Sequence, residues 1–383
     1  MTFKVANIIN TFNSKSGGPP RTVSLIAEAG TGYWKADLFT TEYREPAADT
    51  LLVKEFPGHV NVLPSGAHTV LGGIAMMAGF SRAYRSQLTE GISPDLVHLH
   101  GMWNPFLAAF AATAKAHRIP YIVAPHGMLE PWSLKVRAVR KSLALKFYQG
   151  EILAHAAAIH ATSEMEADNI RRLGIGSAPI FVVPNAVSES LDMRPEDMPA
   201  TSPKKTLLFL SRIHEKKGID LLIQAWNEIR PTDWSLLIVG SGEPNYVERL
   251  RKYCISNHVP DVEFRSHLEG VAREVAFRQA SVFILPTYSE NFGNVVAEAL
   301  IRGVPVITTT GTPWREIIDK QCGWYVNPTV AEVKGAILNA VNTDSLTLRQ
   351  MGERGRVHVK ANYTLPAVRA GLLNMYRSAL NSV

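Results

Sequence analysis

Two glutamates, Glu290 and Glu298, flank Gly293 near the predicted start of a helix over 294–301. The apolar run 282–285 predicts a buried strand leading into this turn, and the helical spacing ends at a glycine. A helix N-terminus offers unpaired backbone N–H groups and the positive end of the helix dipole. The stretch therefore suits a phosphate, or a sugar hydroxyl that donates to a carboxylate.

Two cations, Arg212 and Lys217, lie between a predicted strand over 207–210 and the helix that follows it. Arginine binds phosphate through two parallel hydrogen bonds and lysine adds a point charge, so the pair suits a diphosphate. Solvated surface charge is the alternative interpretation, and the position at a strand end argues against it. Gly240, after the next strand, belongs to a glycine cluster too short for a dinucleotide fingerprint, so we interpret it as close backbone packing.

In the first half of the chain, Gly17 and Gly18 directly follow a predicted strand, and Arg21 lies just beyond them. Glycines let a backbone approach an anionic ligand closely, but a plain tight turn explains the pair equally well. His100 and His126 end two further predicted strands, and each is followed by glycine. A structural and a functional histidine both fit this pattern. A metal site does not, because neither motif has carboxylate or cysteine partners at ligand spacing.

Short apolar runs followed by helical segments recur along the chain. Continuous rather than alternating hydrophobicity indicates strands covered on both faces, and the strand-then-helix order indicates doubly wound parallel sheets. At 383 residues the chain exceeds what one core usually serves, so we expect two such α/β domains. The runs are 5–9, 96–99, 121–124, 180–183, 206–210, 236–239, 282–285 and 304–308.

A break in this pattern marks the predicted domain boundary. Residues 188–203 are rich in charged and turn-forming residues and carry no apolar stripe, which is typical of a linker. The first domain is therefore predicted over 1–187 and the second over 204–365. Because parallel sheets bind ligands outside the carboxyl ends of their strands, two facing sheets would place ligands in the cleft between them.

Composition argues against several classes of protein. Hydrophobic and charged contents of 46% and 19% are globular values, and the longest apolar segment is too short to span a membrane. The net charge of +6 is too diffuse to indicate nucleic acid. The N-terminus lacks a signal-peptide pattern, which favours a cytoplasmic protein. Cys254 and Cys322 fit neither a disulfide framework nor a zinc site, so we expect buried thiols.

A basic amphipathic helix is predicted over 131–150. Such an apolar stripe usually packs on its own domain while the lysines extend to solvent. The alternative is peripheral contact with an anionic membrane, at the inner face of which the protein would then act. The stripe consists of Trp132, Val136, Val139, Leu143 and Phe147, with Lys135, Arg140 and Lys146 beside it and Arg137 and Lys141 opposite.

Together these motifs resemble those of retaining glycosyltransferases of the GT-B fold, specifically glycosyltransferase family 4. The resemblance implies two Rossmann-like domains facing a central cleft, with an acceptor-binding N-terminal domain on which the last helix, 366–383, packs. It covers the second domain nearly end to end and the first more loosely. The motifs are Gly17-Gly18, 98–101, His126-Gly127, 211–218, 239–242, 286–293, 298–300, 303–307 and 323–326.

The resemblance also implies a role for each motif residue. Arg212 and Lys217 would neutralise the donor diphosphate, and Glu298 would bind the ribose. Glu290 would hold the donor sugar, and His126 would lie near the reacting centre. Family members usually need neither a metal nor a cofactor beyond the donor. The donor-binding residues are Gly17, Gly18, Arg212, Lys217, Gly240, Glu290, Asn291, Phe292, Gly293 and Glu298.

The expected reaction is transfer of a hexose or acetamidohexose from a UDP- or GDP-sugar to a glycan. The expected acceptor is a lipid-linked intermediate of a surface polysaccharide such as lipopolysaccharide. A soluble acceptor, a sugar-nucleotide epimerase and a non-catalytic nucleotide-sugar-binding subunit are the alternatives. Two departures from the family pattern concern the acceptor side: Pro19-Pro20 stiffens the glycine loop, and 311–314 contains a tryptophan where small residues are frequent.

Overall fold

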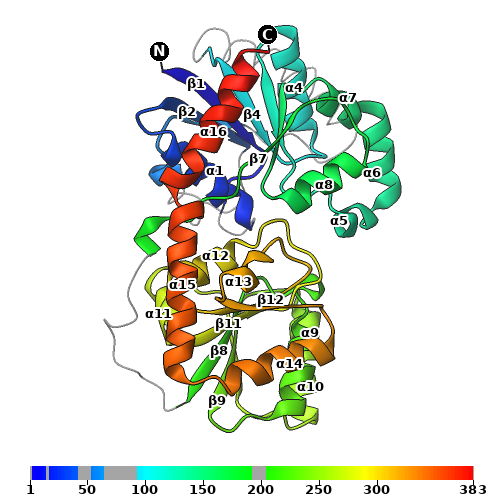
Figure 1. Cartoon of the computed structure of the whole chain (residues 1–383). Coiled ribbons are helices and arrows are strands. Elements are labelled where there is room, and N and C mark those ends of the chain that lie inside the picture. The colour runs from blue at the N-terminus through cyan, green and yellow to red at the C-terminus, as the bar shows by residue number, and fades with distance from the viewer. Residues whose placement is uncertain (1, 14–16, 42–52, 64–92, 192–203, 383) are drawn as a thin grey trace. The chain divides into compact units, whose positions relative to one another are not determined.

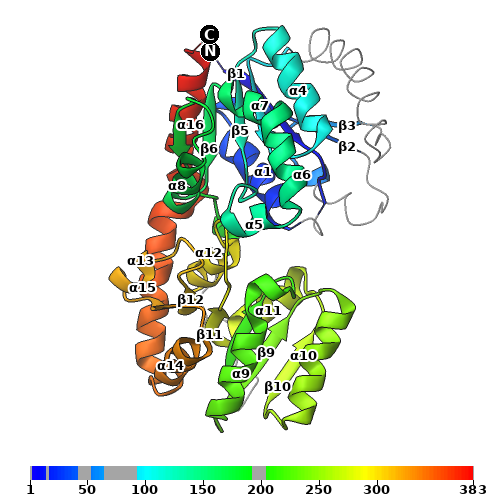
Figure 2. The same cartoon turned by 90° about the vertical axis from the view of Figure 1, so that its right-hand side faces the viewer.

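The computed structural model describes residues 2–13, 17–41, 53–63, 93–191 and 204–382, and it divides the chain into two compact units (Figure 1, Figure 2). The first unit joins Met1–Ala186 to Leu365–Val383, and the second is Val187–Thr364. The last helix therefore belongs to the first unit. Most of the predicted linker 188–203 lies outside the described residues; 188–191 contains a short 3-10 helix, Glu189–Leu191.

The first unit is built on a parallel sheet with the strand order β3-β2-β1-β4-β5-β6-β7. Strand β1 pairs with β2 on one side and with β4 on the other, and its residues from Val5 to Ile9 are buried. Both faces of a parallel sheet are covered, which explains the continuous apolar runs. The strands are β1 (Phe3–Ile9), β2 (Trp34–Thr41), β3 (Val60–Leu63), β4 (Leu96–His100), β5 (Tyr121–Ala124), β6 (Ala158–Ala161) and β7 (Ile180–Val182).

Helices cover both faces of this sheet. Phe106 and Phe110 of α4 pack with Leu99 in one core cluster. Ile26 of α1 and Leu372 of α16 belong to the other core cluster, so the end of the chain completes the first unit (Figure 1). The helices are α1 (Gly18–Ala29), α4 (Pro105–Ala116), α5 (Pro131–Lys135), α6 (Ala138–Ala144), α7 (Gly150–Ala154), α8 (Glu164–Arg172) and α16 (Leu365–Leu380).

The second unit follows the same plan on a parallel sheet with the order β10-β9-β8-β11-β12-β13. Its strands are β8 (Lys205–Leu210), β9 (Trp234–Val239), β10 (Val262–Arg265), β11 (Ala280–Leu285), β12 (Val306–Thr309) and β13 (Gly323–Val326). Its helices are α9 (Ile219–Ile229), α10 (Pro244–Ser256), α11 (Gly270–Gln279), α12 (Asn294–Ile301), α13 (Glu316–Asp319), α14 (Val330–Val341) and α15 (Ser345–Tyr363). The prediction of two doubly wound, Rossmann-like parallel sheets is confirmed.

The prediction of one continuous helix over 131–150 is wrong. Helix α5 ends at Lys135, and Arg137 adopts a left-handed conformation with a φ of 55° before α6 begins. A π-helix, Leu145–Gln149, then joins α6 to α7. The segment therefore changes direction where no glycine or proline signals a break.

The predicted packing of the apolar stripe is also wrong, because the stripe is exposed. Val139 and Phe147 expose 74% and 73% of their surface. The residues of this region that pack on the core are instead Leu134, Leu145 and Ile152. The apolar stripe that the sequence periodicity assigned to the interior is therefore exposed to solvent.

The two cysteines differ in their burial. Cys322 is buried, as predicted, and burial raises the pKa of its thiol to about 11. Cys254 is only half-buried, which corrects the prediction for that residue, because α10 lies at the periphery of its core cluster.

Replacing either of two helical glycines by alanine should have opposite effects on stability. A Cβ atom at Gly352 of α15 would lie 1.7 Å from the carbonyl oxygen of Gly303, whereas one at Gly335 of α14 would meet nothing within 4 Å. Gly352→Ala should lower the free energy of unfolding by about 1–3 kcal/mol through overpacking. Gly335→Ala should raise it by about 0.5–1 kcal/mol, since alanine loses less backbone entropy. Urea unfolding measures both, and shifts of the same sign would contradict this packing.

Candidate functional site

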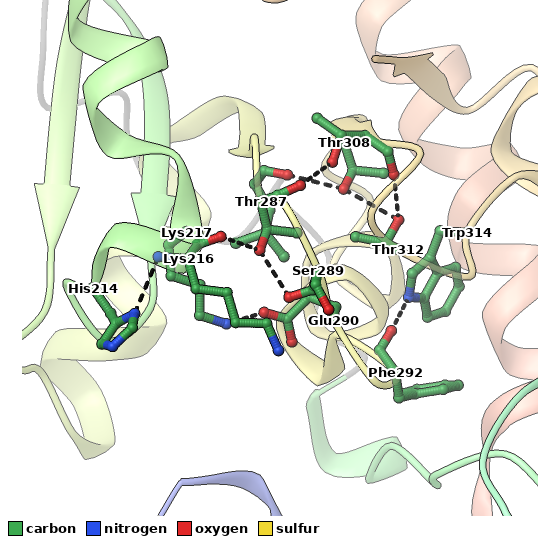
Figure 3. Close-up of polar contacts among 12 residues, drawn as sticks. His214, Lys216, Lys217, Thr287, Ser289, Glu290, Phe292, Thr308, Thr312 and Trp314 are labelled. Atoms are coloured by element: carbon green, nitrogen blue, oxygen red, sulfur yellow. Dashed lines mark hydrogen bonds and ion pairs between the residues drawn. The ribbon is translucent and has the colours of Figure 1, made fainter. Parts of the chain in front are cut away.

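Lys217 and Glu290 form an ion pair in the second unit (Figure 3). Lys217 ends a 3-10 helix, Glu215–Lys217, that follows β8, and Glu290 lies in the loop between β11 and α12. Their side chains expose only 13% and 14% of their surface, which strengthens the attraction relative to a solvent-exposed pair. Two candidates from separate sequence motifs are therefore in direct contact.

The loop that carries Glu290 is held by its neighbours on both sides (Figure 3). The hydroxyl of Thr287 donates to the carbonyl oxygen of Lys216 at 2.8 Å, next to the ion pair. On the other side, the indole N–H of the buried Trp314 donates to the carbonyl oxygen of Phe292 at 2.5 Å. The tryptophan that departs from the family pattern is thus a support of this loop.

Two glycines allow the backbone to approach this loop closely. A Cβ atom at Gly218 would lie 2.1 Å from the carbonyl oxygen of Pro286, and one at Gly311 would lie 2.5 Å from that of Thr287. Gly218 also has a φ of 66°, which other residues rarely adopt. The backbone N–H of Glu290 donates to the carbonyl oxygen of Gly311 at 2.6 Å. Both glycine positions are therefore required for the loop conformation.

Helix α12 begins where the loop ends, as the sequence predicted. Gly293 is its N-cap, in the left-handed conformation with a φ of 78°, and no side chain caps the helix. The N–H of Val296 donates to the carbonyl oxygen of Gly293 at 2.8 Å. The segment Asn291–Gly293 thus lies between the ion pair and the helix N-terminus, where the dipole favours an anion.

Glu298 is held by a cation that the sequence motifs did not reveal. It is 5% exposed, and its Oε2 atom forms an ion pair with Arg273 of α11. Arg302, which is also buried, donates to the backbone oxygen of Glu298 at 2.6 Å. A buried carboxylate needs such a partner because desolvation of an unpaired charge is costly. No described residue hydrogen-bonds Oε1, so that oxygen is available as an acceptor.

Arg212 and Gly240 lie at the ends of neighbouring strands in this unit. Arg212 is exposed after β8 and forms no ion pair with any carboxylate that the structure describes. A Cβ atom at Gly240 would lie 1.9 Å from the carbonyl oxygen of Ser211, which confirms the predicted close backbone packing. A pocket of about 350 Å³ opens beside Gly240, and Arg251 and Arg265 are among its lining residues.

In the first unit, Gly17 and Gly18 form the start of α1. Gly17 is the N-cap, with a φ of 91°, and no side chain caps the helix. A Cβ atom at Gly17 would meet nothing within 4 Å, so conformation rather than space requires glycine there. Because Gly17 and Gly18 are exposed, both the turn and the anion-site interpretations stay open.

His126 lies in a strained turn after β5 and contacts His100. Its φ is 51° and that of Gly127 is 75°, and the N–H of Gly127 donates to the buried Glu166 carboxylate at 2.6 Å. His100 Nδ1 lies 3.0 Å from His126 Nε2. Burial, with a smaller contribution from nearby His160, lowers the pKa of His126 to about 3, so the ring is neutral near pH 7.

The candidate residues thus fall into two groups, one in each unit. The first unit carries the glycine pair and the histidines. The second unit brings Lys217 to Glu290 and surrounds Glu298 with arginines. Sequence reasoning missed Arg273 because it contacts Glu298 from a separate element, and it missed Glu166 although Ser163-x-x-Glu166 is a capping-box pattern at the start of α8. Among the residues that the structure describes, no group of three or more histidines, cysteines or carboxylates is arranged to hold a metal ion.

Two protein-family sequence models match the chain. The model "Glycosyl transferase 4-like domain" matches residues 17–186, and "Glycosyl transferases group 1" matches residues 204–343. Together they span most of both units.

The chain is also similar to curated proteins. One is the GDP-mannose-dependent monoacylated alpha-(1-6)-phosphatidylinositol monomannoside mannosyltransferase of Corynebacterium glutamicum, 28% identical over 295 residues that cover 71% of this chain and 74% of that protein. Another is the alpha-1,3/1,6-mannosyltransferase alg-2 of Neurospora crassa, 26% identical over 190 residues. This match covers 41% of the present chain and only 40% of the Neurospora protein.

Among solved structures, Anabaena HepE in complex with UDP and glucose superposes with a TM-score of 0.76 at 17% identity, covering 98% of this chain and 100% of HepE. This similarity concerns the fold alone. In the present chain each of the two parallel-sheet units carries one group of candidate residues. The family models, the relatives and the fold agree, and the chain belongs to glycosyltransferase family 4 and is a glycosyltransferase of the GT-B type.

Proposed function

We propose that the chain transfers a hexose or acetamidohexose from a UDP- or GDP-sugar to a glycan acceptor with retention of anomeric configuration. The observation that carries the proposal is the largely buried Lys217–Glu290 ion pair, in which Lys217 follows the same strand, β8, as the exposed Arg212. Two similarities support the choice of donor: the Corynebacterium relative is GDP-mannose-dependent, and HepE was solved with UDP and glucose.

In this proposal the two cations stabilise the departing nucleoside diphosphate. Arg212 can bind phosphate oxygens in parallel, and Lys217 is fixed by Glu290 and adds a point charge. Charge develops on the diphosphate as the glycosidic bond breaks, so fixed cations act where the transition state gains charge. We therefore propose that neither a metal nor a further cofactor takes part.

The remaining donor groups have candidate positions in the same unit. The pocket beside Gly240 is proposed to hold the nucleobase, since it lies at the carboxyl ends of β9 and β10. Oε1 of Glu298 is proposed to accept from the ribose, while the ion pair with Arg273 orients the carboxylate.

Glu290 is proposed to hold the donor sugar rather than to attack it. Lys217 donates to Oε1 of its carboxylate, and a carboxylate engaged in such a pair is a weaker nucleophile. Asn291, Phe292 and Gly293 would contribute backbone groups to the same sugar. A covalent glycosyl-enzyme intermediate on Glu290 is therefore not part of the proposal.

We also propose that the acceptor is lipid-linked and that the protein acts at the cytoplasmic face of a membrane, in the synthesis of a surface polysaccharide. The support is the exposed face of 132–147, hereafter the basic apolar face. No helix in the described ranges has the length and apolar character needed to cross a bilayer. The basic apolar face combines Trp132, Val136, Val139, Leu143 and Phe147 with Lys135, Arg137, Arg140 and Lys146, and all are exposed.

This combination of charges and apolar groups fits an anionic bilayer. Apolar side chains enter the headgroup region while basic side chains pair with anionic lipids. Lys141 is not part of the face, because its ammonium group donates to the carbonyl oxygen of Ser133 at 2.5 Å and lies 5.7 Å from the ring centroid of Trp103. A soluble acceptor remains the alternative, and it needs no such face.

The donor site predicts that one arginine dominates nucleotide affinity. Arg212→Gln should weaken binding of UDP or GDP roughly 10- to 100-fold, since a hydrogen-bonded charge contributes about 1.5–3 kcal/mol. Arg230→Gln is the matched control, because Arg230 lies at the opposite end of α9 from Lys217. Calorimetry measures both variants. The donor site as drawn would be wrong if wild type bound neither nucleotide or if Arg212→Gln bound like wild type.

Turnover separates an enzyme from a binding subunit. The wild-type protein, incubated with UDP- or GDP-sugars and a membrane extract as acceptor, should release the nucleoside diphosphate and label the lipid fraction. Nucleotide binding without any turnover would favour the non-catalytic subunit, and label in the aqueous fraction would favour a soluble acceptor.

The basic apolar face predicts binding to vesicles that contain anionic lipid. The double variant Arg140→Gln/Lys146→Gln should bind roughly 30-fold more weakly in co-sedimentation, since each basic residue near the surface contributes about 1 kcal/mol. Arg171→Gln/Arg172→Gln, on α8 of the same unit, removes the same charge from another exposed surface and should bind nearly as wild type. Equal losses in both variants, or no binding by wild type, would refute membrane docking.

A further inference from the structure

Four histidines in the first unit form two hydrogen-bonded pairs behind the carboxyl edge of the sheet. His98 and His100 lie two residues apart on β4, His160 lies on β6, and His126 follows β5. All four have lowered pKa values, with burial as the main cause, so each ring is neutral near pH 7. A neutral imidazole has one donor and one acceptor nitrogen, so each pair has a direction.

The direction of the first pair is set by Asn7 of β1. Its amide nitrogen lies 3.4 Å from the carbonyl oxygen of Asp37, which can only accept, so its Oδ1 atom faces His100. His100 Nε2 lies 3.2 Å from that oxygen and must donate to it. His100 Nδ1 is then an acceptor, and His126 Nε2, at 3.0 Å, must be the donor.

The remaining nitrogen of His126, Nδ1, therefore carries no proton and can accept a hydrogen bond. No residue in the described ranges hydrogen-bonds Nδ1 of His126, and the ring is half-buried. The backbone that carries the ring is fixed separately, because Glu166 accepts from the N–H of Gly127 at 2.6 Å and from that of Thr162 at 2.8 Å. With the turn held in this way, the tautomer decides whether the ring offers a donor or an acceptor.

We propose that Asn7 and His100 are positioning residues that hold His126 in the Nε2–H tautomer, so that Nδ1 accepts a hydrogen bond from a hydroxyl of a sugar bound at the first unit. The hydrogen bond from the sugar to Nδ1 rests on the proposed transferase function, whereas the assignment of the tautomer does not. In this arrangement Nδ1 of His126 offers the sugar neither a positive charge nor a proton. The buried amide of Asn7 influences the substrate indirectly, through its hydrogen bond to His100 and the bond from His126 to His100.

The second histidine pair provides an internal comparison. His160 Nε2 donates to the carbonyl oxygen of Val183 at 2.8 Å, so His160 Nδ1 accepts from His98 Nε2 at 3.3 Å. His98 Nδ1 then accepts from the hydroxyl of Tyr376 on α16, at 3.0 Å. This pair ends on a buried tyrosine and presents no nitrogen to a ligand. Tyr376→Phe is therefore a control that disturbs a buried histidine pair without touching Asn7.

The test is ¹⁵N NMR of full-length protein labelled at histidine, with His126 assigned by loss of its signals in His126→Gln. Wild type near pH 7 should show His126 protonated at Nε2 and unprotonated at Nδ1. Asn7→Leu should mix or reverse the tautomers of His126, Asn7→Asp should retain them because it keeps an acceptor oxygen, and Tyr376→Phe should not change them. A proton on Nδ1 in wild type would overturn the proposal, even if the variants failed to fold.

Kinetics test whether Nδ1 of His126 accepts a hydrogen bond from the sugar. Asn7→Leu should lower the rate of sugar transfer at saturating sugar nucleotide roughly tenfold, about the contribution of one hydrogen bond, and leave the Kd for free UDP or GDP unchanged. Asn7→Asp should restore most of the loss. Equal weakening of free nucleotide would indicate general damage and refute a positioning role. Absence of any turnover would count against the proposed function, while the NMR result would still decide the tautomer.

Discussion

The ion pair between Lys217 and Glu290 is the interaction on which the proposed donor site depends. Two largely buried charges stabilise one another only if both are held in place, and the backbone does this at Gly218, where any Cβ atom would clash with the carbonyl oxygen of Pro286. The conformations of the loop after β11 and of the turn after β8 therefore depend on one another. A donor diphosphate would meet cations that are already positioned, which is what electrostatic preorganisation requires.

Much of the fold was predictable because parallel sheets impose a simple constraint on sequence. Central strands are buried on both faces, and β1, β4, β8 and β11 accordingly contain continuous runs of buried, mostly apolar residues. Strand β10 at the edge of the second sheet alternates between half-buried and exposed residues, and β13 at the other edge is half-buried throughout. The apolar runs of the sequence missed these two edge strands, and they also missed β2 and β6, which are interior strands of the first sheet.

The segment 131–150 shows where periodicity fails. The stripe through Val139 and Phe147 fits a helix, yet Leu134 and Leu145 make the packing contacts because Arg137 interrupts the helix in a left-handed conformation. Arginine carries no local signal for that conformation, so only the tertiary packing reveals it. The same reason hides Arg273, which contacts Glu298 from a separate helix.

The two units also divide the chemistry in a way that residue types alone could not show. The second unit supplies arginine and lysine cations, whereas burial lowers the pKa values of His98, His100, His126 and His160 in the first unit and keeps these four rings neutral near pH 7. Stabilisation of a departing diphosphate would then come from Arg212 and Lys217. The contribution of His126 would be directional: a lone pair whose orientation is fixed by Asn7 through His100, and whose strength does not change with pH near neutrality. Such a group selects the hydroxyl pattern of a sugar through the direction of one hydrogen bond.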